Sequence, residues 1–236
     1  MSPFLGEFVG TAFLILMGGG VVANVVLNKT NGQNSGWIVI TFGWAMAVFL
    51  GVYSSQKLGG GGHLNPAVTL ALLAFGTFKS SLVTTYLLAQ LSGAFAGAVL
   101  VWLAYKKHFD ASTDADLKKA IFCTAPAIRS PLHNAITEFI GTFVLMFGAL
   151  ALSPSAHSLG SLDALPVSLL VLGIGLSLGG PTGYAINPAR DLGPRIAHFF
   201  LPIPGKRDSD WAYSWVPIIA PIAGAMSAAW IFSQLN

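Results

Sequence analysis

The sequence predicts an all-α membrane protein with six transmembrane helices and two shorter helices that enter the membrane without crossing it. Three observations predict this fold class: a very apolar composition, six long uncharged segments, and an Asn-Pro-Ala motif that occurs twice. Of the 236 residues, 54% are hydrophobic and only 9% are charged, whereas soluble domains carry about 25% charged residues. Lipid is therefore the expected solvent for most of the surface.

Six segments are apolar and long enough to span a bilayer, which takes about 20 residues of helix. They contain no Asp, Glu, Lys or Arg and cover residues 8–27, 37–56, 80–105, 139–162, 164–189 and 211–236. Two further stretches, 66–75 and 188–199, are about half a membrane long, near 15 Å at about 1.5 Å per residue. Gly76 follows the first of these, and glycine commonly ends helices.

The chain also repeats itself. EFVGTAFLILMG, beginning at Glu7, resembles EFIGTFVLMFGA, beginning at Glu138. AQLSGAFAGA from Ala89 likewise resembles APIAGAMSAA from Ala220. Each half then holds three spans and one short helix in the same order, and an odd number of spans inverts the second half relative to the first. Inverted repeats of this kind place a shared site near the bilayer midplane.

These repeats predict the domain organisation. We expect one channel domain over 1–236, built from repeats at about 4–105 and 134–236. The polar segment 106–133 would join them as a loop.

Asn-Pro-Ala predicts where each short helix starts, since Asn favours the capping position and Pro the first helical position. The motif occurs at Asn65, Pro66 and Ala67 and again at Asn187, Pro188 and Ala189. Two half-helices that meet end to end add up to about 30 Å, one hydrocarbon thickness. Their positive dipole ends would then oppose cations and protons at the midplane, while the two Asn amides could donate to a neutral hydroxyl or to water.

Glycine-rich segments lead into both short helices, at 59–64 and 179–184. Such backbone is not regular helix. At membrane depth it is tolerated only where protein buries it or where it lines a wet cavity. We therefore expect these segments to line a passage.

Together these motifs resemble the major intrinsic protein, or aquaporin, family over nearly the whole chain. HLNPAVT at 63–69 and NPARDLGP at 187–194 match the family's two signature loops, and EFxGT opens both repeats. The resemblance implies an aquaporin-like fold and a passive channel for water and small uncharged solutes, with no cofactor. It also implies a homotetramer in the lipid bilayer of the plasma membrane, with cytoplasmic termini.

Asp191, directly after Arg190, makes the sequence similar to the glycerol-conducting branch, and the short tails and compact loops are typical of bacterial members. The resemblance places Arg190, Gly175 and Tyr184 at the narrowest constriction. The fourth position falls on Ile40, where glycerol facilitators usually have Trp. We therefore expect a wider opening that admits glycerol and also bulkier solutes such as lactic acid, dihydroxyacetone or urea. A register error of one residue in this span would instead turn Ile40 toward lipid.

Further roles follow from the resemblance alone. It implies that solute contacts backbone carbonyls of Gly61, Gly62, His63, Pro181, Thr182 and Gly183. Glu7, Glu138 and Gln90 would accept or donate hydrogen bonds that hold the irregular loops, although the two carboxylates could also carry protons. Residues 51–62 form a longer segment than is usual at this place, which indicates either a cytoplasmic gate or a plain insertion.

The charge distribution disagrees with the implied orientation. With cytoplasmic termini, Lys57 and Lys79 lie inside, against the positive-inside rule. The other basic residues apart from Arg190 would lie outside: Lys29, Lys106, Lys107, Lys118, Lys119, Arg129, Arg195, Lys206 and Arg207. One interpretation is a basic outer mouth that gathers carboxylates such as lactate by electrostatic steering.

Other function classes fit the sequence less well. A secondary active transporter remains the alternative, since transporters also use inverted repeats, but coupling usually needs ionisable groups at the midplane. No catalytic motif indicates an enzyme. The histidines are too scattered to predict a metal site, and no long basic run indicates a nucleic-acid partner.

Overall fold

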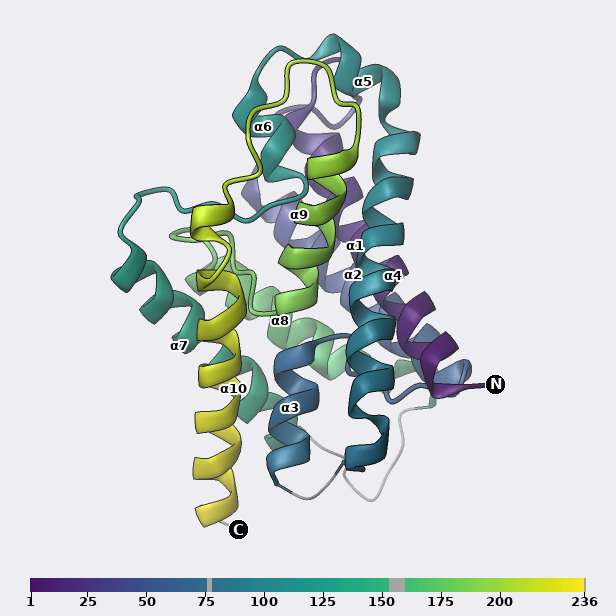
Figure 1. Ribbon diagram of the computed structural model, residues 1–236, viewed down its shortest axis with the longest axis vertical. Helices are drawn as coiled ribbons and strands as arrows, with labels where there is room; N and C mark the ends of the chain where they lie inside the picture. The colour runs from purple at the N-terminus through teal and green to yellow at the C-terminus, as the bar shows by residue number, and fades with distance from the viewer. Residues whose placement is uncertain (76–77, 153–159, 236) are drawn as a thin grey trace.

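A computed structural model describes residues 1–75, 78–152 and 160–235, and this part of the chain is a bundle of helices without strands (Figure 1). Five helical segments are long and apolar enough to cross a membrane. They are α1 (Pro3–Val26), α2 (Trp37–Lys57), α4 (Val83–Ala104) with the 3-10 turn η1 (Ser80–Leu82) before it, α7 (Pro131–Ala151), and α10 (Val216–Leu235) with η3 (Trp211–Tyr213) before it. The all-α membrane fold class is confirmed.

The fifth predicted span, 164–189, forms a much shorter helix than expected. Helix α8 covers Leu165–Leu178, 14 residues, and follows a 3-10 turn, η2 (Gly160–Leu162). At about 1.5 Å per residue it reaches about 21 Å, less than a hydrocarbon core of about 30 Å. An absence of charge does not make a helix, and the backbone leaves the helix at Gly179, where the glycine-rich segment begins.

The fourth span also differs from its predicted range. Helix α7 begins at Pro131 rather than at 139 and ends at Ala151. The prediction started after Glu138 because a charge is costly in lipid, but this side chain is buried inside the protein, 1% exposed. Residues 153–159 and Gly76 lie outside the described residues.

The two halves pack in matching ways. In the first half α1 packs against α2 and α4, and in the second half α7 packs against α8 and α10. The two half-helices cross over: α3 (Pro66–Ala74) packs against α10, and α9 (Pro188–Phe200) packs against α4. Each half-helix is therefore held largely by the other half of the chain.

The predicted loop 106–133 contains two short helices, α5 (Lys106–Ala111) and α6 (Ala115–Ala120). Asp114 caps α6 by accepting hydrogen bonds from the amides of Asp116 and Leu117 at 2.8 and 3.0 Å. Both helices lie at the end of the molecule opposite the C-terminus (Figure 1). We call residues 105–130 and 201–215 the capping layer.

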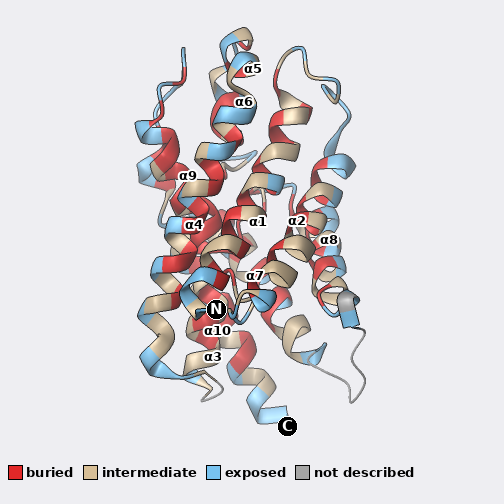
Figure 2. Ribbon diagram, turned by 90° about the vertical axis from the view of Figure 1, so that its right-hand side faces the viewer, coloured by how far each residue is buried: buried red, intermediate tan, exposed pale blue. Residues whose placement is uncertain are grey.

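Buried residues concentrate inside the bundle, and exposed ones lie on its outer faces and at its ends (Figure 2). Large apolar side chains are among the most exposed on these faces. Phe42, Leu88, Leu169, Ile219 and Trp230 are each 51–59% exposed. An apolar outer surface around a packed interior suits a lipid solvent rather than water.

Candidate channel between the two half-helices

The two Asn-Pro-Ala motifs meet inside the bundle. Asn65 accepts a hydrogen bond from the amide of Ala67 at 2.9 Å and so caps α3. Asn187 caps α9 in the same way, through the amides of Ala189 and Arg190 at 2.9 and 3.2 Å. The proline after each Asn takes the first helical position, where its missing N–H has no cost.

Each asparagine also reaches across to the opposite loop. The amide nitrogen Nδ2 of Asn65 donates to the carbonyl of Ile186 at 2.9 Å, and that of Asn187 donates to the carbonyl of Leu64 at 2.8 Å. These carbonyls belong to residues with positive φ, 42° at Ile186 and 52° at Leu64. The reciprocal bonds fix the half-helices cap to cap, and one hydrogen of each amide group is left to donate elsewhere.

Glu7 holds the first loop from its place inside α1. Its carboxylate accepts hydrogen bonds from three successive backbone amides, those of Gly62, His63 and Leu64, at 2.8–3.0 Å. It also accepts from Ser55 Oγ at 3.0 Å and from Gln90 Nε2 at 2.8 Å. A buried carboxylate with five donors around it is satisfied without a proton partner.

Glu138 occupies the matching place in the second half. It accepts hydrogen bonds from the amides of Ala185 and Ile186 at 3.0 and 2.8 Å. Both acidic side chains therefore have partners in the irregular loops, which is the structural role the resemblance implies for them.

A cavity of about 180 Å³ runs past both asparagines. Seven residues from the sequence-based assignment line it: Gly61, Gly62, His63, Asn65, Tyr184, Asn187 and Arg190. Much of the remaining wall is aliphatic, including Leu14, Val48, Val68, Leu145 and Val171. The lining of the passage thus combines polar groups with aliphatic side chains.

Several assigned residues do not line this cavity within the described part of the chain. They are Ile40, Pro66, Ala67, Gly175, Pro181, Thr182, Gly183, Pro188 and Ala189. In the second loop the lining residues are Tyr184, Ala185 and Ile186 instead. The carbonyl of Pro181 accepts a hydrogen bond from the amide of Ala127 at 3.0 Å, which ties it to the capping layer.

The aromatic wall beside Arg190 comes from Trp44 rather than from position 40. The Arg190 guanidinium lies over the Trp44 ring, with Cζ 4.2 Å from the ring centroid. Ile40 is one helical turn earlier on the same face of α2, so the sequence pattern alone does not decide which of the two lies at this depth. The expectation that this wall lacks a tryptophan is therefore wrong for this structure.

Gly175 lies directly against the Tyr184 side chain. A Cβ at this position would lie 3.0 Å from Cζ and 3.1 Å from the hydroxyl oxygen of Tyr184. The Trp37 indole donates to the Gly175 carbonyl at 3.1 Å and contacts the Tyr184 ring edge to face. Glycine at this position therefore makes room for the Tyr184 ring.

Arg190 presents free donors to the cavity. It is 7% exposed, and its guanidinium makes no hydrogen bond to another part of the chain that the structure describes. A guanidinium carries five N–H donors, so those that face the cavity can bind a hydroxyl or carbonyl oxygen.

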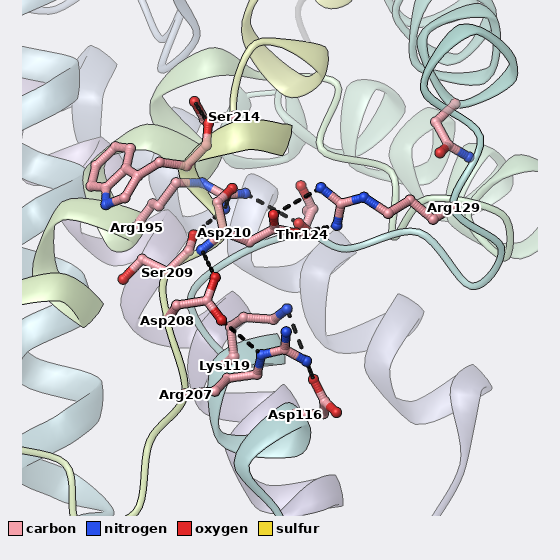
Figure 3. Close-up of polar contacts among 12 residues, drawn as sticks. Asp116, Lys119, Thr124, Arg129, Arg195, Arg207, Asp208, Ser209, Asp210 and Ser214 are labelled. Atoms are coloured by element: carbon pink, nitrogen blue, oxygen red, sulfur yellow. Dashed lines mark hydrogen bonds and ion pairs between the residues drawn. The ribbon is translucent and has the colours of Figure 1, made fainter.

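Sequence reasoning missed the support behind this site. Asp191 and Arg195 form a fully buried ion pair, with Nε 2.6 Å from Oδ1 and a second contact of 2.8 Å. Asp191 also accepts hydrogen bonds from the amide and hydroxyl of Thr124. Arg195 donates to the backbone carbonyls of Thr124, Ser209 and Asp210 (Figure 3). The spacing i, i+4 of an Asp and an Arg on one helix was the available signal.

Most basic residues of the capping layer form ion pairs or hydrogen bonds within the protein, which argues against a basic outer mouth. Arg129 forms two hydrogen bonds to Asp210, and Arg207 pairs with Asp116 and Asp208 (Figure 3). Lys118 and Lys206 donate to backbone carbonyls. The ammonium groups of Lys106 and Lys119 pair with Asp110 and Asp116. Of the nine basic residues assigned to the outer side, only the ammonium groups of Lys29 and Lys107 have neither an ion pair nor a hydrogen bond within the described residues.

No group of three His, Cys, Asp or Glu side chains in the described ranges is placed to hold a metal ion.

Comparisons with known proteins agree with this geometry. The family model described as major intrinsic protein matches residues 1–232. A probable glycerol uptake facilitator protein of Thermotoga maritima is 55% identical over 100% of both chains, and a D/L-lactic acid transporter of Lactiplantibacillus plantarum is 43% identical over 98% of this chain and 96% of that protein. The structure of the aquaglyceroporin from Plasmodium falciparum superposes with a TM-score of 0.86 at 32% identity, over 99% of this chain and 95% of that one.

Proposed function

This chain belongs to the major intrinsic protein family, and on that premise we propose that it is a passive channel for glycerol and similar small uncharged solutes. It is a multi-pass membrane protein and not an enzyme. The observation that carries the proposal is that one and the same cavity passes both asparagines and is lined by Arg190, Trp44 and Tyr184.

The two kinds of lining in the cavity suit the two parts of a polyol, its hydroxyl groups and its carbon backbone. Free donors of Arg190, Asn65 and Asn187 can bind hydroxyl oxygens, and backbone carbonyls of the first loop can accept from hydroxyl hydrogens. The carbon backbone can meanwhile slide along the aliphatic wall and the rings of Trp44 and Tyr184. A solute that has both hydroxyl groups and a carbon backbone exchanges its hydrogen bonds to water for hydrogen bonds to the cavity, so its entry costs little free energy.

Cations are disfavoured at the same place. The positive ends of α3 and α9 meet where the two asparagines lie, and each end carries roughly half a charge. Arg190, whose side chain is largely buried with 7% exposed, adds a full positive charge beside the cavity. A cation or hydronium ion would therefore meet an electrostatic barrier that a neutral solute does not.

A secondary active transporter is less well supported. Coupling needs a midplane group that changes its charge or binds an ion. Glu7 and Glu138 both already accept hydrogen bonds from loop amides, so proton binding would break the loops that they hold.

We also propose the placement and assembly that the family resemblance implies. Residues 1–236 form one domain of two inverted repeats, and four copies form a homotetramer in the bilayer of the plasma membrane. The termini are cytoplasmic and the capping layer faces outward. Pairing of its basic residues reduces the conflict with the positive-inside rule.

Stopped-flow light scattering on proteoliposomes tests the function. We expect glycerol flux that rises linearly with concentration, ignores ion gradients and exceeds that of empty liposomes. Dihydroxyacetone, urea and lactic acid at several pH values map the solute range, and neutral lactic acid is the second candidate because of the 43% identical lactic acid transporter. Saturating uptake that collapses with an ion gradient would contradict the channel.

A further inference from the structure

The long segment 51–62 is not an extra loop but an extension of α2. Helix α2 continues to Lys57, and Gly59 follows the cap with φ of 92°. The amide of Gly60 donates to the carbonyl of Ser55 at 2.9 Å, and that of Gly59 donates to the carbonyl of Gln56 at 3.2 Å. This pair of bonds around a left-handed glycine is a Schellman C-cap, which gives the helix a defined end.

The extension lengthens the face of α2 that lines the cavity. Trp44, Val48, Val52 and Gln56 follow each other at intervals of four residues, and all four line the cavity. Twelve residues of helix cover about 18 Å. This row of four side chains therefore begins with the Trp44 ring beside Arg190, continues with two aliphatic side chains, and ends with the Gln56 amide beside the first loop.

Gln56 lies against the backbone of that loop. A Cβ added at Gly62 would lie 3.4 Å from Gln56 Cγ and 3.5 Å from its Nε2. Its neighbour Ser55 bonds both Glu7 and the amide of Gly62, so the last turn of α2 and the loop are held in register. The Gln56 amide itself has no hydrogen-bond partner among the described residues.

We propose that Gln56 is a specificity-determining residue that binds polyol hydroxyls at the end of the cavity opposite Arg190. Its amide offers a donor and an acceptor together, beside the first-loop backbone at Gly61 and Gly62, which also lines the cavity. The surrounding side chains of Val52 and Val68 offer none. A polyol that leaves the Asn pair therefore finds here a partner for a hydroxyl before it reaches bulk water.

The inference rests on the proposed solute channel, and one experiment separates the two. Glycerol and water permeability are measured in proteoliposomes for wild type, Gln56→Met and Gln56→Ala, with Gln234→Met as the control. Methionine keeps the length of the side chain and removes the amide. Gln234 is an exposed glutamine at the end of α10 that does not line the cavity within the described residues.

We expect Gln56→Met to lower glycerol permeability about two- to tenfold, the equivalent of one net hydrogen bond, while water permeability changes less than about twofold. Gln56→Ala should also fall below wild type, and Gln234→Met should match it. Glycerol permeability at or above wild type in Gln56→Ala would show a steric plug and overturn the proposal, as would an unchanged Gln56→Met. Absence of glycerol flux in wild type would instead overturn the channel itself.

Discussion

The two half-helices begin in the same way but are held in place differently. Each starts with an asparagine cap that also bonds the opposite loop. The first loop is then held from within, because Glu7 alone gathers five donors. Glu138 takes two backbone amides of the second loop, and α9 is anchored from outside by the Asp191–Arg195 pair and the capping layer.

This difference matches the difference in side chains between the two half-helices. The first half-helix is apolar and ends after nine residues, so one internal carboxylate is enough to order its loop. The second half-helix carries Arg190, whose side chain must stay in one place beside Trp44 and Tyr184. A positively charged group at a helix N-terminus opposes the dipole, and the network behind it offsets that cost.

The largest expected effect comes from breaking the outside anchor. Asp191→Ala leaves Arg195 as an unpaired buried cation, which costs about 3–5 kcal/mol. We expect a poor yield of folded protein and a lower unfolding temperature in detergent, measured by fluorescence-detected chromatography. The double variant Asp191→Leu with Arg195→Leu should recover much of the loss. Equal stability of Asp191→Ala and wild type would show that the pair does not anchor α9.

The next effect compares the two carboxylates directly. Glu7→Gln removes a charged acceptor from five donors and turns an amide toward backbone N–H groups, whereas Glu138→Gln affects two backbone amides. At about 1.5–3 kcal/mol for a hydrogen bond to a charged group, Glu7→Gln should be the more destabilising by about 2 kcal/mol. Thermal unfolding in the same detergent measures both. The reverse order would remove the contrast between an internally held loop and an externally held one.

A smaller effect is expected at the constriction. Trp44→Ala removes the ring under the Arg190 guanidinium and should raise permeability to five-carbon polyols severalfold relative to glycerol. Ile40→Ala, one turn away, should change this ratio less than about twofold. Solute flux into proteoliposomes gives the ratio, which compares the tryptophan that the structure places there with the isoleucine that sequence similarity suggests. A larger response at Ile40 would restore the sequence-based assignment.

The smallest effect concerns pH and the capping layer. The hydrogen bond from Arg129 holds the pKa of the Asp210 carboxyl below its ordinary value, which is about 3.9. A lowered folded-state pKa contributes stability that is present above the ordinary pKa and is lost as pH falls through the lowered one.

Wild type should therefore exceed Arg129→Gln in stability by at most about 1 kcal/mol near neutral pH, and the difference should vanish in strong acid. Unfolding temperatures over a pH series measure it. A gap between wild type and Arg129→Gln that persists below the lowered pKa would mean that the contribution of Arg129 is not electrostatic.

Local sequence patterns are enough to predict much of the architecture. Uncharged runs located the membrane helices, Asn-Pro located the two half-helix starts, and repeated segments indicated the inverted halves. These features depend on neighbours in sequence, since capping and helix length are local properties. The same logic misplaced the ends of α7 and α8, because a buried Glu138 does not end a helix and an uncharged glycine segment does not continue one.

Only the tertiary structure decided which side chains meet across the bundle. Ile40 and Trp44 share one face of α2, and only the depth at which α2 packs against α8 and the loops places Trp44 beside Arg190. From the sequence, Arg195 is predicted to lie among the basic residues of the outer side, but its side chain is fully buried against Asp191. Composition and periodicity fix what a residue can do, whereas burial and pairing depend on segments distant in the chain that only the packed fold brings together.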